Sequence, residues 1–226
     1  MAEFLAKKNL ELILTGRKEV PFPIDLSTKE GRKPLLNKIS EKKPDLIINN
    51  AGVGLYGETL KHSIDEQLEI IEVNVNALVE ITLHSAKTLI DAGKTGTILN
   101  ISSAACFFPY PTFNIYAASK GFVTSFSLAL DRELKGTGVR VLCACPGQIA
   151  TNFRNRAAKG HPQTADRRTM SSEQAVCHLW KQIEKGKPLT IFGGKTRVMV
   201  WIARCLPRPI LDKILMSGIK ERFPAE

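Results

Sequence analysis

Apolar residues along this chain form short continuous runs that alternate with longer segments of helical spacing. Short runs of this kind predict buried strands, which we expect at residues 10–15, 45–50, 96–102, 139–143 and 188–192. Segments in which apolar residues recur every third or fourth position predict helices at 27–42, 63–92, 113–135 and 171–185. Strands that alternate with helices predict an α/β fold with a mostly parallel sheet.

The predicted helices begin with residues that commonly cap helices. Ser27 is an expected N-cap for the helix at 27–42, and Ser171 or Ser172 for the helix at 171–185. The sequence Ser63-Ile-Asp-Glu66 has the spacing of a capping box, which predicts the start of the long helix there.

Tyr116 and Lys120 lie four residues apart in the helix predicted at 113–135, so they share one face, one turn apart. A neighbouring ammonium favours the phenolate, so we expect Lys120 to lower the pKa of Tyr116 from its usual value of about 10. A tyrosine tuned in this way can pass a proton to or from a carbonyl or alcohol oxygen. Ser103 follows the strand at 96–102, where its hydroxyl can face the same oxygen. These three side chains form a candidate catalytic site.

Further motifs occur in a fixed order around Ser103 and Tyr116-x-x-x-Lys120. They are Asn49-Asn50-Ala51-Gly52 after a strand, Val73-Asn74-Val75 on the next helix, and Cys145-Pro146-Gly147-Gln-Ile-Ala-Thr151 after a later strand. Together they resemble the short-chain dehydrogenase/reductase family over about residues 2–193. The resemblance implies a Rossmann-like, doubly wound sheet in a three-layer α/β/α arrangement. It also implies hydride transfer between NAD(P) and a carbonyl or secondary alcohol.

The resemblance implies a role for each matching residue. Tyr116 would be the acid/base, Ser103 would hydrogen-bond the reacting oxygen, and Lys120 would hold the ribose and lower the pKa of the tyrosine. Asn74 would hold a water that extends the proton relay, with Asn76 as the alternative. The residues expected at the cofactor are Arg17, Asp25, Leu26, Asn50, Ala51, Gly52, Tyr116, Lys120, Pro146, Gly147 and Thr151. No metal site is expected.

The residues that follow the strand at 10–15 bear on the choice of cofactor. In dinucleotide-binding folds an acidic residue there suits the 2′-hydroxyl of NAD, and a basic residue suits the 2′-phosphate of NADP. Gly16 stands where NAD-dependent members of the family carry the acid, and Arg17 is next to it. NADP(H) is therefore expected over NAD(H). An exposed arginine in a turn is the alternative interpretation of Arg17.

The chain departs from the family pattern near its N-terminus. The family opens with a strand, a Gly-x-x-x-Gly-x-Gly turn and a helix, whereas this chain begins within what resembles that helix, so the predicted fold is N-terminally incomplete. We expect a gap in the sheet where that strand would lie. Only Lys18-Glu19-Val20 then separates Arg17 from the strand-like segment 21–25, which is too few residues for a parallel crossover. The segments at 10–15 and 21–25 are therefore expected not to pair in parallel, or the second to be a loop.

These departures support a rival interpretation from a different class. The chain would be a catalytically inactive remnant or fragment that cannot bind a dinucleotide, either an interaction protein or the product of a misassigned start site. The presence of Ser103, Tyr116 and Lys120 favours the enzyme.

Four aromatic residues, Phe107, Phe108, Tyr110 and Phe113, lie between the candidate serine and tyrosine. Such a cluster either belongs to the core or lines an apolar substrate pocket. With the apolar C-terminal segment it favours a hydrophobic substrate, such as a long-chain, steroid-like or acyl ketone. Cys106 stands where we expect the family's glycine, and is expected to narrow the loop above the site.

The predicted Rossmann-like domain covers residues 1–194. One segment within it and one segment after it have a composition of their own. Residues 152–170 are polar and basic and predict a substrate lid. Residues 195–226 form a C-terminal extension with apolar stretches at 198–206 and 210–216. The basic residues of this extension include Arg197, Arg204, Arg208, Lys213 and Lys220. Basic amphipathic helices of this kind can lie on an anionic membrane surface, cover the substrate pocket or form a dimer contact.

Composition narrows the remaining classes. With 226 residues, 43% hydrophobic and 24% charged, the chain is expected to form one soluble domain in the cytoplasm, with peripheral membrane contact through 195–226 as an option. The net charge of +10 fits scattered solvated lysines, a phosphorylated cofactor or an acidic surface. No nucleic-acid-binding motif is present, so the expected partners are a small carbonyl or alcohol substrate and further copies of the chain in a homo-oligomer.

Overall fold

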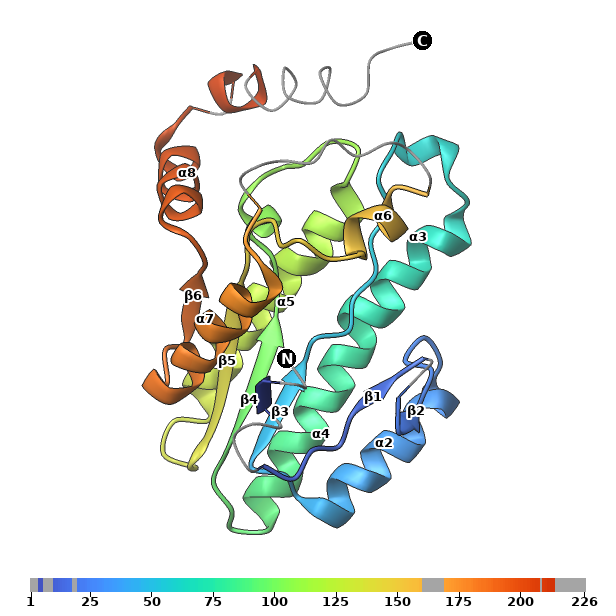
Figure 1. Ribbon diagram of the computed structural model, residues 1–226, viewed down its shortest axis with the longest axis vertical. Helices are drawn as coiled ribbons and strands as arrows, with labels where there is room; N and C mark the ends of the chain where they lie inside the picture. Colours follow the sequence, from blue (N-terminus) through green and yellow to red (C-terminus); the bar gives the residue numbers. More distant parts are fainter. Residues whose placement is uncertain (1–3, 6–9, 18–19, 160–168, 208, 214–226) are drawn as a thin grey trace.

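A parallel α/β arrangement is seen in the computed structural model, which describes residues 4–5, 10–17, 20–159, 169–207 and 209–213 (Figure 1). Its main sheet has four parallel strands in the order in which they occur along the chain. These strands are β3 (Leu46–Asn49), β4 (Gly96–Ile101), β5 (Val139–Cys145) and β6 (Leu189–Ile191).

Helices connect and cover the strands. They are α2 (Lys29–Lys42), α3 (Ile64–Ile71), α4 (Leu78–Asp91), α5 (Asn114–Glu133), α6 (Phe153–Ala157), α7 (Ser172–Lys185) and α8 (Gly194–Cys205). Short 3₁₀ turns occur at η1 (Thr59–Lys61) and η3 (Ala104–Phe107), and η2 (Glu72–Ala77) is a π-helix. No helix in these described ranges is long and apolar enough to cross a bilayer.

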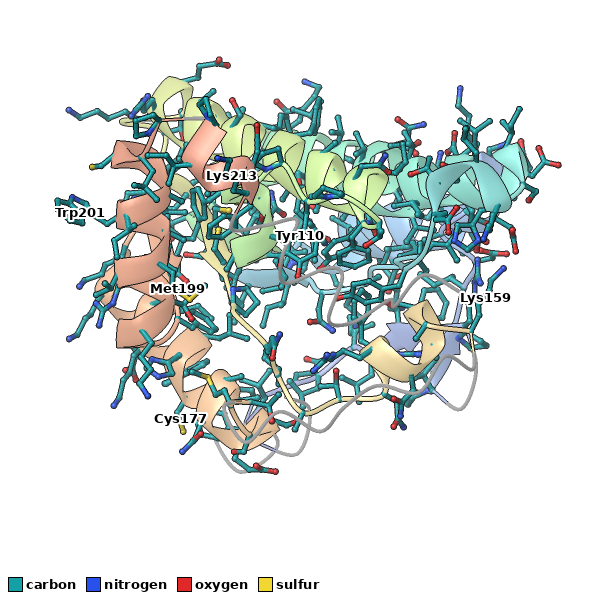
Figure 2. The ribbon with its side chains drawn as sticks, turned by 90° about the horizontal axis from the view of Figure 1, so that it is seen from above. Tyr110, Lys159, Cys177, Met199, Trp201 and Lys213 are labelled. Carbon is teal, nitrogen blue, oxygen red and sulfur yellow. The ribbon has the colours of Figure 1, made fainter. Side chains whose placement is uncertain are left out.

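The alternation of side chains along β4 and β5 builds two separate cores. Ile98 pairs in register with Val141, and both pack with Leu89 and other residues of α4 and α5 on one face of the sheet. The next residue along β4, Leu99, pairs with Leu142 and packs on the opposite face with Leu179 of α7. Figure 2 shows α5 along one side of the molecule and α7 along the other. The predicted three-layer α/β/α Rossmann-like fold is therefore confirmed.

Most helix starts agree with the sequence, and one is corrected. Ser63 and Ser171 both cap their helices in complete capping boxes. The helix predicted from Ser27 is instead capped by Thr28, whose hydroxyl accepts a hydrogen bond from the backbone N–H of Gly31. The Ser27 hydroxyl is occupied by the Asp25 carboxylate, to which it donates at 2.7 Å.

The N-terminal segments differ from the prediction. The buried strand expected at 10–15 is reduced to β1 (Thr15–Gly16), and the side chains of Leu10 and Ile13 are exposed. β1 pairs in parallel with β2 (Phe22–Pro23), through bonds such as Ile24 N–H to Gly16 O at 2.8 Å. The expectation that these segments would not pair in parallel is therefore wrong. A full crossover is unnecessary because β1 and β2 are each only two residues long. The chain therefore has to travel back only about 7 Å between the end of β1 and the start of β2.

The sheet is divided between the β1–β2 pair and β3, as expected from the gap predicted between the segments at 10–15 and 45–50. β1 and β2 form a separate two-stranded sheet, which stands apart from β3–β6 in Figure 1. Within the described residues β3 pairs only with β4, and its four residues are all partly exposed. Partial exposure lets water satisfy the backbone groups on the outer edge of β3.

Arg32 of α2 joins the segment that follows β1 and β2 to the π-helix and to α4. Its side chain is 2% exposed, and its Nη1 donates to the carbonyl of Leu26 at 2.7 Å. Its Nε lies 2.5 Å from a carboxylate oxygen of Glu80 on α4, and its Nη1 lies 3.5 Å from Glu72 in the π-helix. One guanidinium thus joins the loop before α2, the π-helix and α4.

We expect Arg32→Ala to lower the free energy of unfolding by about 2–3 kcal/mol, because it leaves two carboxylates and a carbonyl without their buried partner. Urea denaturation would measure this. The matched control is Lys38→Ala, which removes an i,i+3 pair with Glu41 on the surface of α2 and should cost less than about 0.5 kcal/mol. Equal effects of the two substitutions would contradict the bridging role of Arg32.

Candidate active site

The predicted motifs meet at one edge of the main sheet. Asn50-Ala51-Gly52 follows β3, Ser102-Ser103 follows β4 and Pro146-Gly147 follows β5, and parallel strands place these carboxyl ends together. Two backbone bonds join the last two segments: Ser102 N–H donates to Ala144 O, and Ala104 N–H donates to Pro146 O, both at 2.8 Å. The sheet therefore supplies a fixed frame for the site.

Helix α5 carries Tyr116 and Lys120 to this edge. Both side chains are buried, with 8% of Tyr116 and 4% of Lys120 exposed. The Lys120 ammonium donates to the carbonyl of Ile101 at 2.9 Å and lies 5.7 Å from the centre of the Tyr116 ring. The two residues therefore share one face of the helix, as their spacing predicted.

Ser103 lies beside Tyr116 at this edge of the sheet. The Ser103 hydroxyl accepts from the backbone N–H of Ala105 at 3.2 Å. Burial raises the pKa of Tyr116 above its ordinary value, and the neighbouring Ser103 hydroxyl opposes that shift. The expected lowering of this pKa is therefore wrong here, because loss of solvent dominates and Lys120 is itself buried.

Burial shifts the pKa of Lys120 in the opposite direction. It lowers the pKa of Lys120 to about 8, because the charged ammonium loses its hydration. A Cβ atom at Gly52 would lie 3.4 Å from both Lys120 Nζ and Asn74 Oδ1, so the absence of a side chain at Gly52 leaves space directly in front of these two polar groups.

Asn74 is fully buried in the π-helix, and its side chain joins the segment after β3 to helix α5. Its Oδ1 accepts from Val53 N–H, while its Nδ2 donates to Val53 O and to the Ser119 hydroxyl, at 2.9–3.0 Å. The alternative residue, Asn76, is exposed and donates to Glu72. Between the two, Asn74 is the one that lies at the site. Its π-helical position is common at functional sites and could not be read from apolar spacing.

An aromatic stack covers Tyr116. The ring of Phe113 stacks on those of Tyr116 and Tyr56, with 4.2 Å and 3.8 Å between ring centres. The ring centre of Phe153 in α6 lies 5.4 Å from that of Tyr116. A Cβ at Gly54 would lie only 2.9 Å from Phe153, so this glycine makes room for the rings. Sequence reasoning missed Tyr56 and Phe153. The sequence gives one indication of each: Tyr56 follows Gly54 by two residues, and Phe153 follows the cofactor candidate Thr151 by two residues.

The predicted aromatic cluster is divided between two places. Phe113 joins the stack, whereas Phe107, Phe108 and Tyr110 line an open apolar cavity of about 570 Å³ against α5. Ser103, Tyr116 and Lys120 do not line this cavity. Cys106, expected to narrow the loop above the site, is instead turned to α5, where its sulfur accepts a hydrogen bond from the Thr124 hydroxyl at 3.4 Å.

The predicted lid begins with α6, and residues 160–168 of it lie outside the described residues. The carbonyl of Ala157 accepts from Tyr56 N–H at 2.8 Å, and Lys159 forms an ion pair with Glu66 of α3. Figure 2 shows Lys159 at the rim of the molecule, on the side of α6. α6 is thus fastened over the aromatic stack.

The residues expected near the adenosine form a second group. The exposed Arg17 side chain lies 2.5 Å from Glu69 of α3 and 3.5 Å from Asp25. The Asp25 carboxylate also accepts from Ser27, which lowers its pKa, and Leu26 is held through its carbonyl by Arg32. Arg17 is therefore an exposed arginine in the bend after β1, and its charge is paired with Glu69 and Asp25.

The remaining cofactor candidates lie in the loops after β5 and after β3. Pro146 is buried and Gly147 is partly exposed, and a Cβ at Gly147 would lie 2.9 Å from the hydroxyl of Thr196 in α8. Thr151 is exposed, and its hydroxyl accepts from Phe153 N–H at 3.4 Å. Asn50 and Ala51 are exposed after β3, at the same edge.

This fold and this edge define a Rossmann-like α/β protein with a Ser–Tyr–Lys site. A family model described as short chain dehydrogenase matches residues 2–161, which is most of the chain. The chain therefore belongs to the short-chain dehydrogenase family.

Individual relatives agree with this assignment. Sulfoacetaldehyde reductase 2 of Chromohalobacter salexigens is 30% identical over 171 residues, covering 67% of this chain and 68% of that protein. The probable oxidoreductase EphD of Mycobacterium tuberculosis is 25% identical over 217 residues, 88% of this chain, but the match spans only 37% of that longer protein. Among solved structures, a short-chain dehydrogenase from Sphingobium yanoikuyae in complex with NADPH has a TM-score of 0.76 at 22% identity. That match covers 100% of this chain and 91% of the other, and supports the fold.

Proposed function

We propose that this protein is an NADP(H)-dependent oxidoreductase that interconverts a carbonyl and a secondary alcohol of a hydrophobic substrate. The observation that carries the proposal is the convergence of Ser103, Tyr116 and Lys120 beside Gly52 and Asn74 at the carboxyl edge of the sheet. Membership of the short-chain dehydrogenase family supports the same reaction. The inactive alternative is disfavoured because the four catalytic candidates, Asn74, Ser103, Tyr116 and Lys120, all lie at this site.

The residues at this edge fit the nicotinamide end of a dinucleotide. The space in front of Lys120 Nζ, left open by Gly52, suits a ribose whose hydroxyls can accept from the ammonium. Asn50, Ala51, Pro146, Gly147 and Thr151 would border the same ligand. When bound, the nicotinamide would give hydride to the carbonyl carbon or take it from the alcohol.

The protein's own groups would handle the proton and the oxygen. Because its pKa is raised, Tyr116 is protonated at neutral pH and can donate its proton to a carbonyl oxygen. Ser103, which lies beside Tyr116, would donate to the same oxygen and fix its position. Lys120, with a pKa of about 8, would hold the ribose and favour the phenolate left after proton transfer. Asn74 would order the segment after β3 and hold the relay water.

The substrate would meet an apolar surface. Phe113, Tyr56 and Phe153 surround Tyr116, so a carbonyl that reaches the phenol must pass aromatic rings. Only 8% of Tyr116 is exposed, so α6 would move aside to admit a ligand. These contacts favour a long-chain, steroid-like or acyl ketone.

Titration of the chain with NADPH and NADH, followed by nucleotide fluorescence and thermal shift, tests the proposal. Micromolar binding with a raised melting temperature supports it. Failure of both nucleotides to bind would overturn it and favour the inactive alternative.

Preference for NADP(H) is expected to depend on Arg17. Arg17→Ala should raise the KM for NADPH by about tenfold and change the KM for NADH by less than about twofold, because only NADPH carries the 2′-phosphate. Steady-state kinetics with both cofactors would measure this. Glu69→Gln is the matched control, since it releases Arg17 from its ion pair and should lower the KM for NADPH. Equal losses with both cofactors in Arg17→Ala would contradict a phosphate contact.

The protein is also proposed to form a homo-oligomer in the cytoplasm. Sedimentation velocity would test the oligomer. Peripheral membrane contact through residues 195–226 is a separate question, argued from α8 below.

A further inference from the structure

Helix α8 has apolar side chains on two opposite faces. One face packs on the protein, where Val200 is 2% exposed and Thr196 lies over Gly147. On the other face Val198, Trp201 and Ile202, at positions i, i+3 and i+4, are 55%, 67% and 41% exposed, and the neighbouring Met199 is 60% exposed. Core packing therefore explains only the first face.

The exposed face is turned away from the candidate active site. In Figure 2 α8 forms one end of the molecule, and Trp201 projects outward from it, away from the other helices. Its side chain therefore does not cover the aromatic stack around Tyr116. This argues against a role as a wall of the substrate pocket, which the sequence left open.

The charges around this face identify its partner. Lys195 and Arg197 are exposed at the start of α8, and α8 contains no acidic residue. Past the end of α8, Ile210 is 48% exposed and Lys213 is also exposed, with Asp212 as the acidic residue between them. An isologous contact between two copies would bring these cations face to face at the rim of the apolar stripe, which is unfavourable. An anionic surface would be attracted by them.

We propose that the outer face of α8 docks this protein on an anionic lipid bilayer. Val198, Trp201 and Ile202 enter the boundary between head groups and acyl chains, where tryptophan is favoured. Lys195 and Arg197 bind lipid phosphates and carboxylates. The helix has 12 residues and is about 18 Å long, so it lies on the surface and does not span. This inference is independent of the proposed oxidoreductase function.

Vesicle co-sedimentation of the full chain tests the proposal. The wild type should bind vesicles of phosphatidylcholine and phosphatidylserine and bind pure phosphatidylcholine vesicles at least about fivefold more weakly. Trp201→Glu should reduce binding to the anionic vesicles by about tenfold, since it removes the largest apolar side chain of the exposed face. Arg197→Glu should weaken binding to the anionic vesicles by about fivefold.

Leu60→Glu is the matched control. Leu60 is 97% exposed on η1, so the substitution adds the same charge at another exposed apolar position. It should leave vesicle binding unchanged. Equal losses in Leu60→Glu and Trp201→Glu, equal binding to both kinds of vesicle, or no vesicle binding would overturn the proposal. A lower mass of Trp201→Glu than of wild type in sedimentation velocity without lipid would also overturn it, because α8 would then contact a second copy.

Discussion

Tyr116→Phe should reduce the turnover of a ketone substrate by at least about 10³-fold while leaving the fold and nicotinamide nucleotide binding intact. The substitution removes only the phenolic oxygen. The ring keeps its stacking with Phe113 at 4.2 Å and its contact with Phe153. The loss should therefore fall on kcat, because the donor of the proton is gone and a water cannot easily replace it in a site where 8% of the residue is exposed. NADPH oxidation in the presence of substrate would measure kcat.

Tyr110→Phe provides the matched control for this prediction. It removes the same atom from a tyrosine in the open cavity, which Ser103, Tyr116 and Lys120 do not line. Its kcat should stay within about twofold of wild type. Near-normal turnover in Tyr116→Phe would exclude the tyrosine as the acid/base.

Lys120→Met should change activity and stability in opposite directions. We expect turnover to fall by at least about 10²-fold, because the ribose loses its donor and the phenolate its neighbouring cation. Stability should rise at neutral pH. The pKa of Lys120 is about 8 in the folded protein and about 10.5 in an unfolded chain, so the unfolded state binds more protons between these values. Keeping the buried ammonium charged at pH 7 costs roughly 3 kcal/mol. The hydrogen bond to Ile101 O offsets about 1 kcal/mol of that cost.

The difference in stability between wild type and Lys120→Met should depend on pH, because the pKa of Lys120 differs between the folded and unfolded states. Wild-type stability should increase relative to Lys120→Met as the pH rises, so the advantage of the variant should shrink by roughly 2 kcal/mol between pH 7 and pH 9.5. Urea denaturation of both proteins at these two pH values would measure the change. Lys87→Met is the control for the same substitution at an exposed lysine, which pairs with Asp91 on the surface of α4 and should change the free energy of unfolding by less than about 0.5 kcal/mol. A variant that is equally destabilised at both pH values would contradict a buried, desolvated Lys120.

Local patterns predicted most of the fold because each is governed by a short-range rule. Apolar runs marked β3 to β6, and the capping box at Ser63 predicted the start of α3 to the residue. The N-cap of α7 was narrowed to Ser171 or Ser172, and the structure has Ser171. The pattern at 10–15 misled because, in the part of the chain that the structure describes, Leu10 and Ile13 have no neighbouring strand to bury them. Whether a run of residues becomes a strand depends on a partner elsewhere in the chain, and spacing carries no information about that partner.

The site was predicted as far as motifs extend. Ser103, Tyr116, Lys120 and Asn74 meet as expected, because strand ends and one helix face place them. The predicted direction of the Tyr116 pKa shift was wrong. The sequence shows the neighbouring lysine but not the burial that outweighs its effect. The roles of Tyr56, Phe153 and Arg32 were missed, because they depend on contacts between segments far apart in the chain.

Direct transfer of deuterium from cofactor to product tests the central claim most directly. NADPH carrying deuterium at nicotinamide C4, in each of its two stereochemical forms, would be incubated with the chain and a panel of ketones that includes acetophenone, a long-chain 2-alkanone and a steroid ketone. Mass spectrometry of the alcohols should find deuterium on the carbinol carbon with one of the two forms, and none in reactions with Tyr116→Phe. NADPH binding without deuterium in any product would show that this site holds the nucleotide but does not perform hydride transfer to ketones.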